Sequence, residues 1–262
     1  MKVFVTGASG FIGTAVMRIL REREHDAREM RSRLENGRAV EKELRTFKPK
    51  AVIHLAWQGI PDLSAATSAK NLVDGIRFYK LLGKLRISKV IATGTCWQHE
   101  EEAHSGNHAP FVAAKNALQI LGKDFVENGG GVFVWTYPYF VYGPGKPGRS
   151  LVPFLIAEAK AGRAPRAKNS DAWHDFVYVD DVARALVLLA EKNIKSDAYD
   201  VGSGKLTRTG DIAALIARIF KMRTPRLRQT NPRGLRADNR PLVKATGWKP
   251  RVSMREGIQK MI

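Results

Sequence analysis

The fold is decided by the stretch Val3-Phe4-Val5-Thr6-Gly7-Ala8-Ser9-Gly10-Phe11-Ile12-Gly13. An apolar strand runs into a turn with three glycines, and a helical pattern follows. In such a turn the first glycine permits the tight reversal, the second lets the backbone approach a pyrophosphate, and the third packs the helix closely on the strand. The N-terminus of the helix then favours an anion. A glycine-rich structural turn is the alternative, but the flanking strand and helix favour a dinucleotide clamp made by Gly7, Ser9, Gly10, Phe11, Ile12 and Gly13.

Length and composition indicate one large domain or slightly more, since the chain has 262 residues. No apolar run approaches membrane-spanning length and the chain enters a strand at once, so we expect a cytoplasmic protein without a membrane partner. Cys96 is the single cysteine, which excludes an internal disulfide and argues against a metal site. The net charge of +19 indicates anionic partners, namely nucleotides, nucleic acid or acidic surfaces.

The end of the second strand, expected over residues 25–31, bears on the choice of cofactor. A dinucleotide fold places an acidic residue about 20 positions past the glycines to bind the ribose 2′-hydroxyl, or a basic residue to accept a 2′-phosphate. Here Arg31, Ser32 and Arg33 stand in that region, with no carboxylate until Glu35. The two guanidiniums favour NADP over NAD. A solvated basic loop is the alternative in so basic a chain.

Helical and strand patterns alternate along the first half of the chain. Residues 51–57 are almost continuously apolar, which is typical of a central parallel strand covered on both faces. We therefore predict an α/β fold with a doubly wound parallel (Rossmann) sheet and a small C-terminal substrate-binding lobe. The expected boundary divides residues 1–142 from 143–262, with segments near 172–204 returning to complete the first domain.

Several motifs stand in one order along the chain, and together they resemble the extended short-chain dehydrogenase/reductase family of nucleotide-sugar epimerases, dehydratases and 4-ketoreductases. Besides the glycine turn they are VIHLAW (52–57), FVYGPG (140–145), HDFVYVDDVARAL (174–186), YDVGSG (199–204) and GWKP (247–250). The resemblance implies a nucleotide-diphosphate sugar as substrate, and we expect a homodimer. It also implies cofactor contacts from Leu55, Ala56, Trp57, Lys115 and Pro138.

The catalytic segment departs from the family pattern. By resemblance, Thr95 holds the position of the family's Ser or Thr hydroxyl and Lys115 that of the lysine in its Tyr-x-x-x-Lys motif. Phe111 stands where the tyrosine is expected. A phenyl ring has no proton to exchange, so the acid–base role is vacant unless another group fills it, and its loss slows such chemistry by typically 10²- to 10⁴-fold.

Other side chains near this segment could replace the tyrosine. Histidine has a suitable pKa near neutrality, and we single out His99 as a catalytic candidate. A merely solvated histidine is the alternative. The full set of candidates is His99, His104, His108, Cys96 and Tyr137.

Substrate contacts are also altered in the second half. Tyr137 and His174 stand in positions that the family gives to arginine, and Phe140 in one often held by asparagine. We expect substrate contacts from Thr95, Cys96, Phe111, Tyr137, Phe140, Arg149, His174 and Arg236. Lys146, Arg149 and Arg236 are the candidates for a diphosphate, which the forked donors of guanidinium suit well.

Three hypotheses follow. The first is an NADP-dependent enzyme that reduces a 4-keto nucleotide sugar or epimerises a nucleotide sugar, and the second is a catalytically silent NADP(H)-binding protein. The third is an RNA-binding protein, suggested by the net charge and by the basic residues 221–240. That segment has no aromatic residue between Phe220 and Trp248 on which bases could stack, so nucleic acid is disfavoured.

Overall fold

The computed structural model describes residues 1–100, 106–146, 150–224, 227 and 230–262. Its centre is a six-stranded sheet with the strand order β2-β1-β3-β4-β5-β8, and every neighbouring pair is parallel. The strands are β1 (Lys2–Thr6), β2 (Asp26–Glu29), β3 (Ala51–His54), β4 (Lys89–Thr93), β5 (Val132–Pro138) and β8 (Asp197–Val201). The predicted doubly wound parallel sheet is confirmed.

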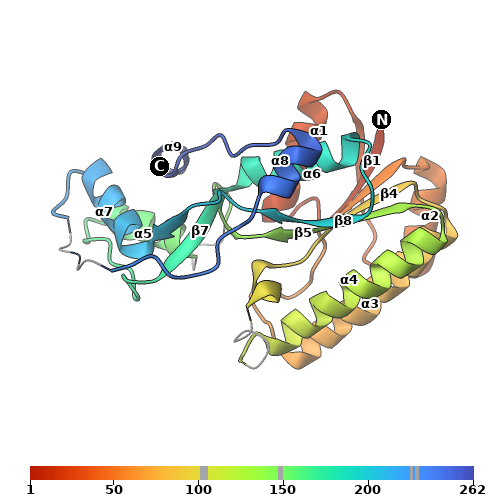
Figure 1. The fold of residues 1–262 in the computed structure, drawn as a ribbon, viewed down its shortest axis with the longest axis horizontal. Coiled ribbons are helices and arrows are strands. Elements are labelled where there is room, and N and C mark those ends of the chain that lie inside the picture. The colour runs from red at the N-terminus through yellow and green to blue at the C-terminus, as the bar shows by residue number, and fades with distance from the viewer. Residues whose placement is uncertain (101–105, 147–149, 225–226, 228–229) are drawn as a thin grey trace.

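Helices cover both faces of this sheet (Figure 1). On one face, α1 (Phe11–Glu22) packs against α6 (Val179–Glu191), and α8 (Arg240–Thr246) lies beside them. On the other face lie α2 (Gly37–Phe47), α3 (Ala65–Lys84) and α4 (Ala109–Asn128), and the last two pack along each other. Each face buries its own apolar cluster, which is why the inner residues of β1, β3 and β4 are apolar on both faces of the sheet.

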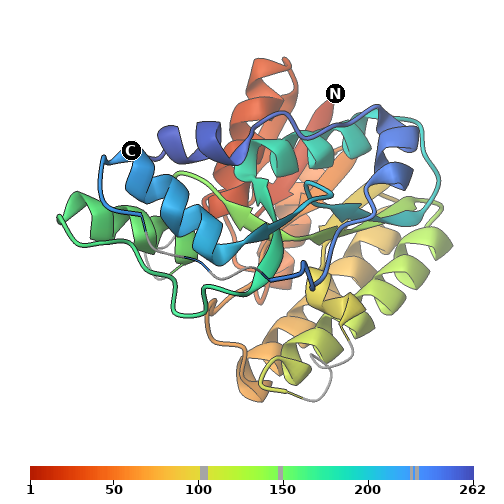
Figure 2. The ribbon, with the colours of Figure 1, turned by 60° about the vertical axis from the view of Figure 1, so that its left-hand side comes forward.

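A second, three-stranded sheet stands beyond the carboxyl ends of the large sheet (Figures 1 and 2). It joins β6 (Phe140–Tyr142) and β7 (Trp173–Tyr178) in parallel and β9 (Leu206–Arg208) antiparallel to β7. The helices α5 (Leu151–Lys160), α7 (Thr209–Ile219) and α9 (Met254–Gln259) accompany it. Residues 172–204 were expected to return to the first domain. Of these, β8 joins the large sheet and α6 packs on it, whereas β7 belongs to the small sheet.

Two predicted strands are shorter in the structure than in the sequence pattern. The strand expected over residues 25–31 spans Asp26–Glu29, at the edge of the sheet where its polar side chains remain in water. The strand expected over 51–57 ends at His54. The apolar residues after His54 therefore do not belong to the sheet and are available to line the site above it.

A buried carboxylate fastens the two sheets together. Asp175 of β7 is fully buried and accepts hydrogen bonds from the backbone of Ser203, Gly204 and Ala237 and from the Ser203 hydroxyl. Burial raises the pKa of Asp175 in spite of these donors. The contacts hold the chain after β8 and the chain before α8 beside the pocket described below. Among the residues that the structure describes, no helix is long and apolar enough to cross a membrane.

Candidate functional site

The turn between β1 and α1 is built so that only glycine fits at its critical points. Gly7 has a φ of +68°, and a Cβ there would lie 2.8 Å from the backbone nitrogen of Ala56. A Cβ on Gly13 would lie 2.1 Å from the carbonyl oxygen of Gly7. Gly10 is the N-cap of α1, which has no side-chain cap and no acidic residue in its first turn. The N-terminal N–H groups of α1 are thus left for an anion.

The backbone after β3 is held against this turn by one hydroxyl. Thr6 Oγ1 accepts hydrogen bonds from the N–H groups of Leu55 and Ala56 and lies 2.7 Å from Nδ1 of His54. Burial and, to a lesser degree, the Lys115 charge lower the pKa of His54 to about 3. The imidazole is therefore neutral and accepts the Thr6 proton at Nδ1. The predicted cofactor residues Leu55 and Ala56 are placed directly beside Gly7.

A carboxylate that the sequence pattern did not reveal lies at the end of β2. Glu43 of α2 accepts hydrogen bonds from the backbone N–H groups of Arg31 and Ser32. Burial raises the pKa of Glu43, but these donors and the Ser32 hydroxyl outweigh it and leave the pKa lowered. The side chains of Arg31 and Arg33 are exposed, and Arg33 lies 3.9 Å from Glu35. The predicted 2′-phosphate region thus contains two guanidiniums and one fixed carboxylate.

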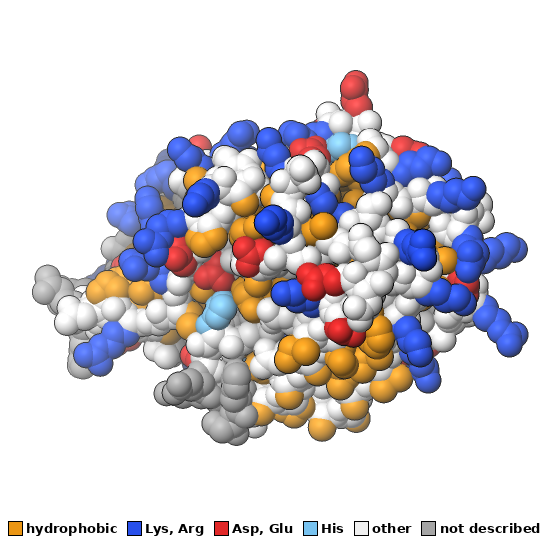
Figure 3. Space-filling model, turned by 45° about the vertical axis from the view of Figure 1, so that its right-hand side comes forward, with side chains coloured by type: hydrophobic (Ala, Val, Ile, Leu, Met, Phe, Trp, Pro, Cys, Tyr) orange, Lys and Arg blue, Asp and Glu red, His pale blue; other side chains and the backbone are white. Residues whose placement is uncertain are grey.

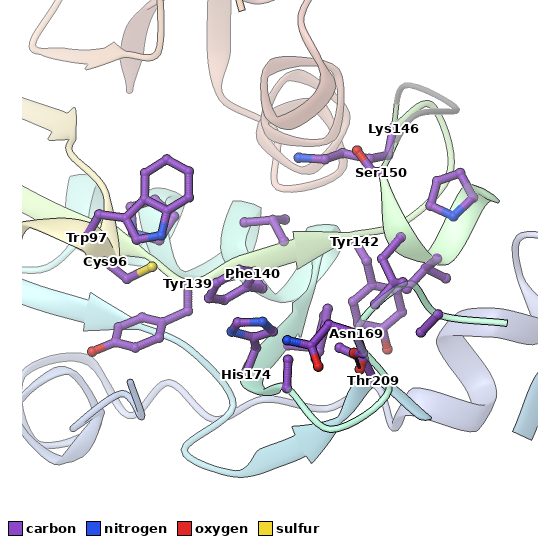
Figure 4. Close-up of a pocket in the computed structure, with 18 of the residues that line it drawn as sticks. Cys96, Trp97, Tyr139, Phe140, Tyr142, Lys146, Ser150, Asn169, His174 and Thr209 are labelled. Atoms are coloured by element: carbon purple, nitrogen blue, oxygen red, sulfur yellow. Dashed lines mark hydrogen bonds between the residues drawn. The ribbon is translucent and has the colours of Figure 1, made fainter. Parts of the chain in front are cut away.

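A pocket of about 560 Å³ opens where the large sheet meets the small one (Figure 4). Thr95, Cys96 and Trp97 come from the chain after β4, and Pro138, Tyr139 and Phe140 from the crossing between β5 and β6. Parallel strands all end at this edge, so ligands of such sheets bind here. Of the predicted substrate and cofactor residues, the pocket gathers Thr95, Cys96, Pro138, Phe140 and His174.

Two features of the pocket suit an anion. The N-terminus of α5 borders it through Ser150 and Leu151, and no side chain among the described residues caps this helix. Lys146 reaches in from the same side, with Nζ 4.8 Å from the centroid of the Phe11 ring at the start of α1 (Figure 4). Burial lowers the pKa of Lys146. The Lys146 ammonium therefore stands between the glycine turn and the pocket.

The floor of the pocket is aromatic. The rings of Phe140 and His174 lie 4.0 Å apart, and Figure 4 shows them side by side in the middle of the pocket. Burial lowers the pKa of His174, so this ring is neutral near pH 7. Asn169 and Thr209 supply polar groups at the far end (Figure 4), and no sequence motif signalled them.

The catalytic segment lies behind one wall of this pocket. Thr95 is the N-cap of the short helix η1 (Cys96–His99), and its hydroxyl accepts a hydrogen bond from the Trp97 N–H. Lys115 is buried in α4, and its ammonium donates to the carbonyl oxygen of Thr93, 2.8 Å away. The Lys115 Nζ lies 4.2 Å from the Trp57 ring centroid and 5.7 Å from that of Phe111.

The predicted substitutes for the tyrosine are turned to other partners. His99 Nε2 lies 2.9 Å from Oδ1 of Asp200, and its ring packs on Tyr137. The Tyr137 hydroxyl donates to Gln119, so this side chain faces α4. Burial, followed by the charge of Glu100, raises the pKa of the Cys96 thiol to about 12. His99 and Tyr137 are thus engaged by Asp200 and Gln119, and the Cys96 thiol stays protonated near neutral pH.

The remaining predicted residues are dispersed. His108 stacks on Trp97 with 4.0 Å between ring centroids. Phe111 is buried between Trp57 and Trp97. Arg236 is exposed, next to Ala237, which packs against Cys96 and Tyr139 at the edge of the pocket. His104 and Arg149 lie outside the described residues.

Comparisons with known proteins agree with this geometry. Residues 3–202 match the model of the NAD dependent epimerase/dehydratase family. A trifunctional UDP-glucose 4,6-dehydratase/UDP-4-keto-6-deoxy-D-glucose 3,5-epimerase/UDP-4-keto-L-rhamnose-reductase of Arabidopsis thaliana is 26% identical over 80% of this chain. The match covers 34% of that protein, so this chain spans about a third of its length. A UDP-glucose 4-epimerase of Mycolicibacterium smegmatis is 26% identical over 100% of this chain and 97% of its own.

Solved structures show the same fold. The UDP-glucose 4-epimerase of Thermotoga maritima, crystallised with UDP-glucose, superposes with a TM-score of 0.84 at 22% identity, covering 100% of this chain and 97% of the other. Complexes with NAD and with NADPH are among the structures of this fold. The family match covers most of the chain, and the glycine turn and the strand order agree with it. The chain belongs to the NAD dependent epimerase/dehydratase family, whose members are NAD(P)-dependent enzymes of nucleotide-sugar chemistry.

Proposed function

We propose that this protein is an NADP-dependent oxidoreductase or epimerase of a nucleotide-diphosphate sugar, and that its main reaction is the reduction of a 4-keto sugar. One observation carries the proposal. Thr95 lines the pocket at the carboxyl edge of the sheet, two residues after the Thr93 carbonyl that holds the buried Lys115, and Lys146 of the pocket lies against Phe11 at the uncapped N-terminus of α1. A nicotinamide and a sugar carbon could thus meet near Thr95.

The residues present fit a dinucleotide. Gly7 and Gly13 let the backbone of the turn pack closely on Ala56 and Ala8, and the N-terminus of α1, which follows Gly10, has no side-chain cap that would compete with a pyrophosphate. Nε1 of Trp57 is buried without a hydrogen-bond partner among the described residues, beside Lys115. A buried unpaired donor is costly, which supports a bound polar group there. When bound, the cofactor supplies or accepts a hydride, and the chain itself orients the sugar through the Thr95 hydroxyl.

The anion features of the pocket support a diphosphate in the substrate. The Lys146 ammonium and the N-terminus of α5 converge on one end of the pocket, and the Phe140–His174 pair offers a flat apolar surface beside them. Complementary charge and a helix dipole stabilise a diphosphate. Arg149 and Arg236 remain proposed contacts.

The end of β2 supports NADP over NAD. Arg31 and Arg33 are exposed there, and Arg33 lies 3.9 Å from Glu35, which also pairs with Lys70. Glu43 opposes a 2′-phosphate with its negative charge, although its oxygens are engaged by backbone N–H groups. The forked donors of the two guanidiniums suit a phosphate, and this supports NADP. NADPH is the usual reductant, and this is why we place reduction before epimerisation.

The experiment combines binding with turnover. Calorimetry should show that NADPH binds at least tenfold more tightly than NADH. Arg33→Ser should reduce this ratio of affinities, whereas Arg38→Ser, at an exposed residue of α2, should leave the ratio unchanged. Spectrophotometry should then show NADPH oxidation with a 4-keto nucleotide sugar. Absence of binding to either coenzyme would contradict the proposal.

A catalytically silent cofactor-binding protein is the second candidate. The observation that favours it is Phe111, which is 6% exposed and packs edge-on against Trp57 and Trp97 in place of the tyrosine. NADPH binding without turnover across a panel of nucleotide sugars would favour this candidate over the enzyme.

A homodimer through α3 and α4 is also proposed. These two helices expose Val73 and Ile120, and Figure 3 shows hydrophobic side chains gathered on the lower part of the molecule, over the two helices. A second copy of the same face could cover them by two-fold symmetry. Sedimentation should show a dimer that Ile120→Asp weakens, while Phe154→Asp on α5 leaves it intact.

A further inference from the structure

We propose that the Lys115 ammonium itself donates the proton to the sugar oxygen, in place of the tyrosine that Phe111 has replaced. The proposal rests on the proposed reductase function. It goes beyond a role for Lys115 in gripping the cofactor, because it makes this side chain the acid of the reaction.

The surroundings of Lys115 are those of a donor rather than of a structural cation. Its ammonium has three N–H groups, and among the described residues its one hydrogen bond is to the Thr93 carbonyl. No carboxylate in the described part of the chain pairs with it. Two aromatic rings, Trp57 and Phe111, flank the remaining sides. Two of its protons therefore have no hydrogen-bond acceptor among the described residues, and the ammonium lies 5.7 Å from the centroid of the Phe111 ring, which holds the position of the missing tyrosine by resemblance.

The electrostatics around Lys115 favour release of a proton. Burial lowers the pKa of Lys115 to about 7. The titratable group of β3 that faces Lys115 is His54, which is neutral near pH 7. On β4 the Lys115 ammonium contacts the Thr93 carbonyl, and on its own helix it faces the phenyl ring of Phe111. None of these groups carries a negative charge that would hold the proton. An acid whose pKa is near the working pH is best suited to proton transfer.

The other acids near the pocket are excluded by their contacts. His99 is directed to Asp200 and Tyr137 to Gln119. The Tyr139 ring lines the pocket, but its hydroxyl donates to Asp200, and burial together with that charge raises its pKa far above neutrality. Figure 4 shows this hydroxyl pointing away from Phe140 and His174. His174 also lines the pocket, but burial lowers its pKa, and Lys146 stands at the end of the pocket beside α5. Lys115 is the group of this set that lies beside Phe111.

Bonds and electrons balance in the proposed reduction of the ketone. A hydride, with its electron pair, reaches the carbonyl carbon from the reduced coenzyme, which is thereby oxidised. The carbonyl oxygen takes a proton as one N–H bond of Lys115 breaks and an O–H bond forms. The ketone has become an alcohol, and the neutral amine, still held near the Thr93 carbonyl, regains a proton from solvent after the product leaves.

Lys115→Arg is the first test, because arginine keeps the charge near the cofactor and cannot release its proton. We expect kcat for the 4-keto sugar to fall by about a hundredfold or more, which is the usual contribution of an acid. NADPH affinity should stay within threefold of the wild type. Lys123→Arg on the exposed side of the same helix is the matched control. A kcat within threefold of the wild type would overturn the proposal.

Lys115→Ala with added methylamine is the second test, since it does not depend on arginine fitting the site. Added methylamine should raise the kcat of Lys115→Ala by at least tenfold. Neither methylamine nor ethylamine should change the kcat of Phe111→Tyr, in which a phenol is again present. Failure of every amine to restore activity in a variant that still binds NADPH counts against Lys115 as the acid.

The third test does not measure activity. Reductive methylation of the free protein at a series of pH values, followed by peptide mass spectrometry, should show Lys115 becoming reactive with a midpoint near pH 7. In the wild type kcat should fall above that pH, and in Phe111→Tyr the fall should move to higher pH. A midpoint close to that of Lys123 would refute the proposal. A wild type that binds NADPH and turns over, but passes none of these tests, refutes the lysine acid alone; a wild type without turnover refutes the proposed function with it.

Discussion

The glycine turn and the catalytic segment lie at the same edge of the sheet, yet they are built differently. In the turn, Gly10 and Gly13 meet the nearby backbone of Gly7 and Ala8, and Gly7 also meets the backbone of the distant Ala56. In the catalytic segment, Lys115 meets Thr93 of β4 and Trp57 after β3, which are distant in the chain. The first region is specified locally, and the second is assembled by packing.

The two regions therefore differ in the amino-acid substitutions that they tolerate. A substitution in the turn has to overcome a backbone clash, which no repacking relieves. The aromatic wall around Phe111 accommodates a new side chain through its neighbours Trp57 and Trp97. This contrast is consistent with a phenylalanine at the position where the family resemblance expects a tyrosine, while all three glycines of the turn are present. The following substitutions test the contrast between the two regions.

Gly13→Ala should be the most damaging single change. The new Cβ would lie 2.1 Å from the Gly7 carbonyl oxygen and 2.7 Å from the Ala8 Cα, so the helix must move away from the strand. We expect the free energy of unfolding to fall by about 4 kcal/mol, measured in urea, and NADPH binding to be lost. Gly37→Ala is the control, since no atom lies within 4 Å of its Cβ, and a loss of similar size there would contradict the local origin of the effect.

Lys115→Met should stabilise the protein at neutral pH. Burial lowers the pKa of Lys115 from 10.5 to about 7, so between these pH values Lys115 is protonated in the unfolded chain and neutral in the folded chain. The loss in free energy of unfolding that Lys115 causes is therefore zero above pH 10.5, grows as the pH falls, and reaches its full value below pH 7. We expect a gain of roughly 3 kcal/mol at pH 7 by urea unfolding and a smaller gain at pH 9.5. Lys123→Met should change neither value, and an equal gain at both pH values would disprove the explanation.

Thr6→Val tests the hydroxyl that joins the two regions. It preserves the shape but leaves the N–H group of Ala56 and Nδ1 of His54 without their partner, whereas the Leu55 N–H keeps the backbone carbonyl of Thr6. We expect a loss of about 2 kcal/mol in the free energy of unfolding. Thr46→Val, on the exposed side of α2, should cost far less. If both variants were equally stable, the Thr6 hydroxyl would have no special role in holding the site.

Glu43→Gln should have the smallest effect. The carboxylate accepts from the backbone of Arg31 and Ser32, and its pKa is lowered, so it is charged at neutral pH. Removing one negative charge near the two guanidiniums should tighten NADPH binding by about threefold and leave NADH binding unchanged. Glu41→Gln on the same helix, where the carboxylate pairs with Arg45, is the control. Weaker NADPH binding in Glu43→Gln would mean that the carboxylate orders the loop more than it repels the phosphate.

The fold was predictable because its signals are periodic and local. The apolar runs of β1, β3 and β4 and the glycine turn identified the doubly wound sheet before any contact was known. Strand ends were less accurate: β3 ends at His54, three residues before the apolar run does. Apolar character reports burial, and residues 55–57 are covered by other elements without being in the sheet.

The site was predictable only in part. The family resemblance proposed Thr95, Phe111 and Lys115 as the positions of the catalytic segment, but it could not reveal that His99 faces Asp200 or that Tyr137 faces Gln119. Successive side chains of a strand point to opposite faces, so Tyr137 and Pro138 are neighbours in sequence and yet face different surroundings. Asn169 reaches the pocket from the loop between α5 and β7 and Thr209 from the start of α7, and no sequence motif marks either residue as part of the site.

The sequence by itself determined the order of the strands and helices and the dinucleotide turn, because backbone conformation at glycines and apolar periodicity act over a few neighbouring residues. Only the tertiary structure decided the surroundings of the buried charged groups. The pKa of Lys115 depends on burial by Trp57 and Phe111, and the contact of Glu43 with residues 31 and 32 depends on how α2 packs beside β2. Both arise from elements that are brought together only when the chain is folded.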